Sequence, residues 1–126
     1  MTDGSAIEAR LAAARARLDR VPAAALSETL TGDDLVVDLR PASDRVANGE
    51  LPGAVVVERI HLEWRVDPTS PDRVPEAVAG RRVVLVCNEG YASSLAAADL
   101  LDLGVDATDV DGGYAAWAAL RAVDPG

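Results

Sequence analysis

Cys87 is the residue best placed for chemistry in this sequence, because it directly follows an apolar run. Val83-Val84-Leu85-Val86 is rich in β-branched residues, which is typical of a buried strand. A short loop, Asn88 to Tyr91, comes next, and the pattern from Ala92 to Leu103 predicts a helix. The first amides of a helix have no partner within it and favour an anion. The spacing therefore predicts a reactive thiolate at a helix start.

The residues that follow Cys87 fit an anion cradle. Gly90 allows the loop to curl so that several N–H groups point inward, and Ser93 and Ser94 can add hydroxyl donors. The alternative is a structural cysteine, since free cysteine is often a small core residue. Position alone leaves both interpretations open.

The elements that must position Cys87 alternate between strands and helices, which predicts an α/β fold with a mainly parallel sheet. Strands are expected at 35–39, 54–57, 83–86 and 108–110, and helices at 5–20, 23–30, around 62–64, 92–103 and 114–120. Sites in such sheets lie at the carboxyl ends of strands. Asp38 and Arg40 end one strand and Cys87 ends another.

Length, charge and cysteine usage bound the function. A chain of 126 residues fits one domain. A net charge of −9 disfavours general binding to nucleic acid or to anionic membranes. A single cysteine cannot form an internal disulfide, which favours a reducing compartment. The N-terminus lacks signal-peptide features and no apolar run is long enough to span a membrane, so we expect a cytoplasmic, soluble protein.

Three motifs, in this order, resemble those of the rhodanese-like domains. The first is Asp38-Leu39-Arg40 followed by Gly49-Glu50-Leu51-Pro52-Gly53-Ala54, the second is Cys87-Asn88-Glu89-Gly90-Tyr91-Ala92-Ser93, and the third is Gly112-Gly113-Tyr114-Ala115-Ala116-Trp117. Each motif alone is weak, but their order and spacing together are specific. The resemblance covers roughly residues 22 to 120.

The resemblance implies a fold and a domain division. The expected fold is the rhodanese-like three-layer α/β fold, with a mainly parallel five-stranded sheet flanked by helices. Residues 22–126 would form this domain and residues 1–21 an N-terminal helical extension. Residues 5 to 20 carry an apolar stripe that can pack on the domain or form a homodimer contact.

The resemblance also implies ping-pong sulfur transfer. Cys87 would be the nucleophile and would carry sulfur as a persulfide, with no metal and no other cofactor. The donor would be a small sulfur-containing anion or a persulfide, and the acceptor a thiol or cyanide. The residues implied to bind the substrate are those of the loop: Asn88, Glu89, Gly90, Tyr91, Ala92 and Ser93. Asp38 and Arg40 would be structural.

Two departures make the rim of this site less cationic than the family pattern. Ala92 stands where single-domain members often have arginine, and Glu89 stands where thiosulfate-using members often have a basic residue. We therefore expect weaker binding of thiosulfate. Our hypothesis is that Arg59 or Arg65 supplies the missing charge; the alternative is that both form surface ion pairs with Glu58 or Glu63.

Two other kinds of site fit the sequence poorly. A cysteine-based phosphatase requires arginine six residues after the cysteine, where this chain has Ser93. A structural zinc site needs more cysteine and histidine ligands than one of each. The remaining alternative is a non-catalytic rhodanese-like binding module, which the departures at Glu89 and Ala92 favour and the retained Cys87 opposes.

Overall fold

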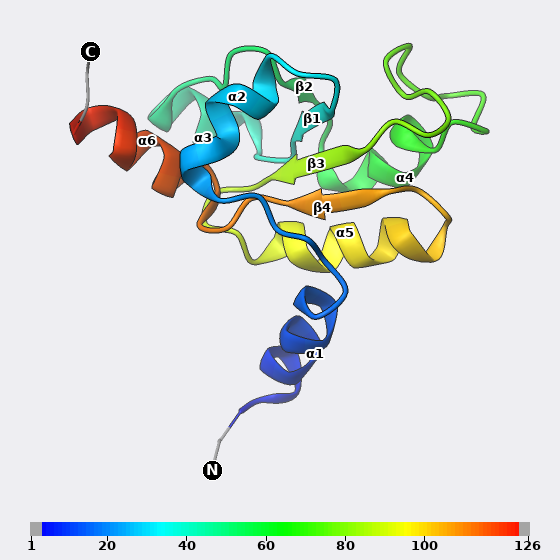
Figure 1. The fold of residues 1–126 in the computed structure, drawn as a ribbon, viewed down its shortest axis with the longest axis horizontal. Coiled ribbons are helices and arrows are strands. Elements are labelled where there is room, and N and C mark those ends of the chain that lie inside the picture. Colours follow the sequence, from blue (N-terminus) through cyan, green and yellow to red (C-terminus); the bar gives the residue numbers. More distant parts are fainter. Residues whose placement is uncertain (1–3, 124–126) are drawn as a thin grey trace.

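A four-stranded parallel sheet organises the structure. The structure is a computed structural model that describes residues 4–123. The strands are β1 (Leu35–Asp38), β2 (Val55–Val56), β3 (Val83–Val86) and β4 (Ala107–Asp109), in the order β2-β1-β3-β4 (Figure 1). The expected α/β fold with a parallel sheet flanked by helices is confirmed.

The expected fifth strand is reduced to one residue in the described chain. Val21 forms an isolated parallel bridge with Val110 beside β4. The backbone N–H of Val21 donates to Asp109 O at 2.9 Å, and that of Asp111 donates to Val21 O at 2.9 Å. Pro22 follows at once and has no N–H to donate, so the pairing does not continue as a ladder.

The sheet is covered on both faces, because side chains of alternate strand residues point to opposite sides. On one face Leu35, Val37, Val83 and Leu85 pack in the same core as residues of α4 (Leu62–Val66) and α5 (Ala92–Asp102). On the other face Val36, Val84 and Val86 pack in a second core with residues of α2 (Leu26–Leu30) and α6 (Gly113–Val123). The short 3-10 segments η1 (Ala23–Ala25) and η2 (Arg59–His61) precede α2 and α4.

Helix α1 (Ala6–Arg15) forms an extra layer outside α5, away from the sheet (Figure 1). The sequence predicted a helix over 5–20. In the structure the helix ends at Arg15, five residues before the predicted end. Beyond α1 the chain runs from α5 back to the sheet edge, where Leu18 packs on the first core and Val21 forms the bridge. Of the predicted apolar stripe, Ala14 and Val21 are buried within this chain, whereas Ile7 is 57% exposed.

Helix α3 (Ala42–Asn48) was not predicted. None of its residues is buried, so its sequence lacks the apolar stripe by which a packed helix is recognised. Pro41 is its N-cap and fixes the backbone at the point where the chain leaves β1. Across residues 4–123, no helix has both the length and the apolar character needed to cross a membrane.

Candidate active site

Three hydrogen bonds surround the sulfur of Cys87, which lies directly after β3. The backbone N–H groups of Gly90 and Ser93 donate to Sγ at 3.2 and 3.4 Å, and the thiol donates to Ser93 Oγ at 3.2 Å. Gly90 has φ +85°, a conformation that glycine adopts without strain and that turns its amide toward the sulfur. The loop therefore provides donors that can stabilise a thiolate or a persulfide anion.

Asp109 connects the sulfur to the end of β4. Ser93 Oγ donates to Asp109 Oδ2 at 2.7 Å, and Ser94 Oγ donates to the same oxygen at 2.7 Å. The carboxylate is fully buried, and a buried charge is tolerated only with a cation and hydrogen bonds around it. The hydrogen bonds form a chain from Cys87 through Ser93 to Asp109.

Two arginines from the N-terminal segment lie behind the loop. Arg20 Nε donates to Asp109 Oδ1 at 2.8 Å, and Arg20 Nη2 donates to the carbonyl of Gly90 at 3.0 Å. Arg15 Nη2 donates to the same carbonyl at 2.7 Å. Burial by itself lowers the pKa of Arg20, but the hydrogen bond and charge of Asp109, with the charges of Asp111 and Cys87, raise it above its usual value. Arg20 is therefore a permanent cation beside the loop.

Arg15, Arg20 and Asp109 were not predicted to be site residues from the sequence. The bonds of Arg15 and Arg20 to the Gly90 carbonyl span 75 and 70 positions along the chain, and the bond of Arg20 to Asp109 spans 89. One signal was present. Asp109 lies inside a predicted strand, and a charge in a buried strand implies a partner.

The start of α6 holds the loop from a third side. The amides of Tyr114 and Ala115 donate to the carbonyls of Cys87 and Asn88, each at 2.9 Å. Gly113 has φ +61°, and a Cβ at this position would lie 2.5 Å from the carbonyl oxygen of Cys87. This close approach explains why the chain needs glycine at this position of the third motif.

Arg40 joins the first and third motifs. Its Nη2 donates to Asp38 Oδ2 at 2.9 Å and to the carbonyl of Gly49 at 2.8 Å, and its guanidinium lies 3.7 Å from the centre of the Tyr114 ring. Both side chains of the Asp38–Arg40 pair are buried. The pair fixes the end of β1 next to Cys87.

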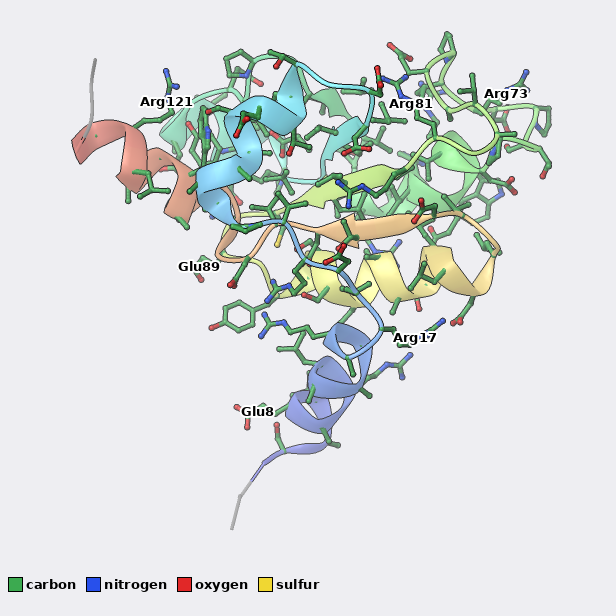
Figure 2. The ribbon with its side chains drawn as sticks, in the orientation of Figure 1. Glu8, Arg17, Arg73, Arg81, Glu89 and Arg121 are labelled. Carbon is green, nitrogen blue, oxygen red and sulfur yellow. The ribbon has the colours of Figure 1, made fainter. Side chains whose placement is uncertain are left out.

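A cavity of about 380 Å³ opens beside Cys87. Its lining combines apolar groups from Leu39, Pro41, Tyr91 and Ala92 with Asn88 and with the charged residues Arg40, Asp44, Arg59 and Glu89. Figure 2 shows Glu89 pointing outward from the edge of the fold. Gly90 and Ser93 instead contact the sulfur with their amides.

The structure separates the two arginines proposed to replace the loop arginine. Arg59 lines the cavity, but its guanidinium also pairs with Glu63 and Asp99, at 3.0 Å each. Arg65 is not brought to this cavity, and its Nη1 donates to the carbonyl of Asp72 at 2.9 Å. No cation without a carboxylate partner lines the cavity within residues 4–123.

A family model for the rhodanese-like domain matches residues 22–120. This match covers more than half of the chain, and its motifs converge on one site. The chain belongs to the rhodanese-like domain family. A search of curated proteins found no significant match.

Solved structures with the same fold include proteins of different descriptions. A protein of unknown function from Rhodopseudomonas palustris, described as a possible tyrosine phosphatase, is 29% identical with TM-score 0.82, covering 95% of this chain and 94% of that one. A thiosulfate sulfurtransferase from Pseudomonas aeruginosa is 25% identical with TM-score 0.62, covering 82% of this chain and 18% of that one. A rhodanese homologue from Thermus thermophilus is 29% identical with TM-score 0.52, covering 75% and 94%.

Proposed function

We propose that this protein is a sulfurtransferase that carries sulfane sulfur as a persulfide on Cys87. The observation that carries the proposal is the set of donors around Sγ, in which the amides of Gly90 and Ser93 converge on the sulfur at the edge of an open cavity. A buried structural cysteine needs neither feature. The family and the likeness to a thiosulfate sulfurtransferase support the same reaction.

The reaction balances as two displacements. The thiolate of Cys87 attacks the outer sulfur of the donor, a new S–S bond forms, and the donor's own S–S bond breaks. The leaving group, sulfite from thiosulfate or a thiolate from an organic persulfide, departs with the electron pair. Cyanide or an acceptor thiol then attacks the outer sulfur of the persulfide and returns Cys87 as the thiolate. The amides of Gly90 and Ser93 stabilise the sulfur anion in both resting states.

The cavity favours a donor that carries an organic group over thiosulfate. Glu89 and Asp44 line it, and Arg59 is already paired with two carboxylates. A dianion loses water on entering and meets no unpaired cation there. Leu39, Pro41 and Tyr91 instead provide apolar surface for an organic group. We therefore propose an organic persulfide, either free or on a partner protein, as the preferred donor.

Intact mass after exposure to thiosulfate, mercaptopyruvate and glutathione persulfide tests the proposal. The wild type should gain the mass of one sulfur, fastest from glutathione persulfide, and lose it with cyanide. The Cys87→Ser variant should gain none. The absence of added sulfur from all three donors would contradict the proposal.

The second candidate function is a non-catalytic binding module. The acidic lining of the cavity is the observation that favours it, because it suits a small anion poorly. A protein that takes no sulfur yet retains partners on an affinity column through the Cys87 loop would have this function. Phosphatase activity lacks comparable support, because Ser93 stands where that chemistry needs arginine.

A further inference from the structure

We propose that Arg20 and Asp109 are positioning residues for Cys87, acting through the hydroxyl of Ser93. The N-terminal segment thereby supplies from behind the loop the cation that the loop itself lacks at Ala92. This inference rests on Cys87 being the reactive group of the proposed function. Neither Arg20 nor Asp109 is among the residues that line the cavity beside Cys87.

The hydroxyl of Ser93 has two partners, and it can donate its proton to only one of them at a time. In the geometry described, the Cys87 thiol donates to Ser93 Oγ and Ser93 donates to Asp109 Oδ2. Once the sulfur is an anion it has no proton to donate. Ser93 then stabilises it by turning its hydroxyl from Asp109 to the sulfur. Asp109 therefore competes with the sulfur anion for the same proton.

Arg20 weakens this competition. It donates to both carboxylate oxygens of Asp109, at 2.8 Å from Nε and 3.2 Å from Nη2, and Ser94 donates to Asp109 as well. When the Ser93 hydroxyl turns to the sulfur, Asp109 still keeps these three donors. The switch therefore leaves no buried oxygen without a partner. The guanidinium charge also balances a carboxylate that would otherwise repel the sulfur anion.

The loop geometry depends on the same segment. Arg20 Nη2 donates to the carbonyl of Gly90, and a Cβ on Gly90 would lie only 3.2 Å from that nitrogen. The amide of this glycine donates to the sulfur. Arg15 adds a second bond to the same carbonyl and one to Ser94 Oγ at 3.1 Å. The N-terminal segment therefore holds the peptide that presents a donor to Cys87.

The experiment measures the pH profile of Cys87 alkylation by iodoacetamide in the full-length protein. Arg20→Gln leaves Asp109 unbalanced, so the midpoint of the profile should rise by about half a pH unit or more. Asp109→Asn removes the competing charge, so the midpoint should fall. The double variant should return close to the wild type. Arg20→Lys, which keeps the charge, should restore most of the wild-type profile.

If Arg20 and Asp109 only supported the fold, the two single variants would not shift the alkylation midpoint in opposite directions. Loss of folding support moves both single variants in the same direction, if it moves them at all. Arg17→Gln is the matched control, because Arg17 lies in the same segment but pairs with Asp102 at the outer end of α5. Shifts of equal sign in Arg20→Gln and Asp109→Asn, or no shift in either, would overturn the proposal. Melting temperatures measured alongside identify a variant that does not fold.

The other charged and titratable residues near the sulfur are the same in the wild type and in all of these variants. From the cavity these are Arg40, Asp44, Arg59, Glu89 and Tyr91, and from behind the loop Arg15 and Asp111. Alkylation needs no sulfur donor. The alkylation profile therefore reports the effect of Arg20 and Asp109 on Cys87 even if no donor transfers sulfur to it. Failure of sulfur transfer is thus distinguishable from failure of this inference.

Discussion

The two sides of the Cys87 loop differ in how their charges are balanced. We call the side that holds Arg20 and Asp109 the back, and the side that opens to the cavity the mouth. At the back, the buried Asp109 is paired with Arg20 and bonded by two serines. At the mouth, Asp44 and Glu89 line the cavity and form no ion pair within the described part of the chain. Buried charges must be matched, whereas carboxylates open to water need not be. In the proposed mechanism, the back therefore determines the state of the sulfur, and the mouth determines which donor approaches it.

The largest expected effect concerns a buried pair at the wall of the cavity. Arg40→Met leaves Asp38 buried without its cation, and the free energy of unfolding should fall by about 3–5 kcal/mol. Arg59→Met is the matched control, because its ion pairs are partly exposed and should contribute at most about 1 kcal/mol. Urea denaturation measures both. Equal losses would mean that burial does not distinguish the two arginines.

A Cβ pressed against the back of the loop should have the next largest effect. Gly113→Ala places a methyl group against the carbonyl of Cys87, in addition to the left-handed backbone. We expect slow sulfur loading and a stability loss beyond the ~1–2 kcal/mol of a left-handed alanine. Gly80 has φ +82° and nothing within 4 Å of its Cβ position, so Gly80→Ala should show only the backbone cost. Normal loading in Gly113→Ala would contradict the close contact.

Reversing a charge at the mouth should change donor preference without changing stability. Glu89→Arg removes a repulsive charge and adds an attractive one, so loading from thiosulfate should rise about tenfold at low salt. Loading from glutathione persulfide should change much less than loading from thiosulfate. Glu76→Arg makes the same charge change on an exposed residue outside the cavity lining and serves as the control. An equal rise in both variants would point to net charge rather than to this rim.

The smallest effect separates the two arginines considered from the sequence. Arg59→Ala should slow thiosulfate loading only about threefold, since its charge is shared with Glu63 and Asp99. Arg65→Ala should leave donor kinetics unchanged, because its side chain lies away from the cavity. A larger effect from Arg65 than from Arg59 would reverse this assignment.

Local patterns explain which parts of the fold the sequence could predict. The four apolar residues of β3 are all buried, and the predicted bounds of β3 match the structure. Helix α5 was expected over 92–103 and spans Ala92–Asp102, because alanine and leucine favour helix and Gly104 follows its end. The position of Cys87 between these two elements follows from the same signals.

Long-range pairing explains what the sequence could not provide. The end of α1 depends on the path from α5 to the sheet edge, which no local pattern records. Arg20 meets Asp109 across 89 positions, and nothing near either residue identifies its partner. The close approach of Gly113 to the carbonyl of Cys87 likewise appears only when α6 packs on the loop.

Release of thiocyanate in a single turnover tests the central claim most directly. The protein is loaded with glutathione persulfide, freed of excess donor and mixed with cyanide. The persulfide account predicts one thiocyanate per chain, together with loss of the added mass from the peptide that contains Cys87, and none from Cys87→Ser. Release of thiocyanate by Cys87→Ser, or none from the loaded wild type, would contradict it.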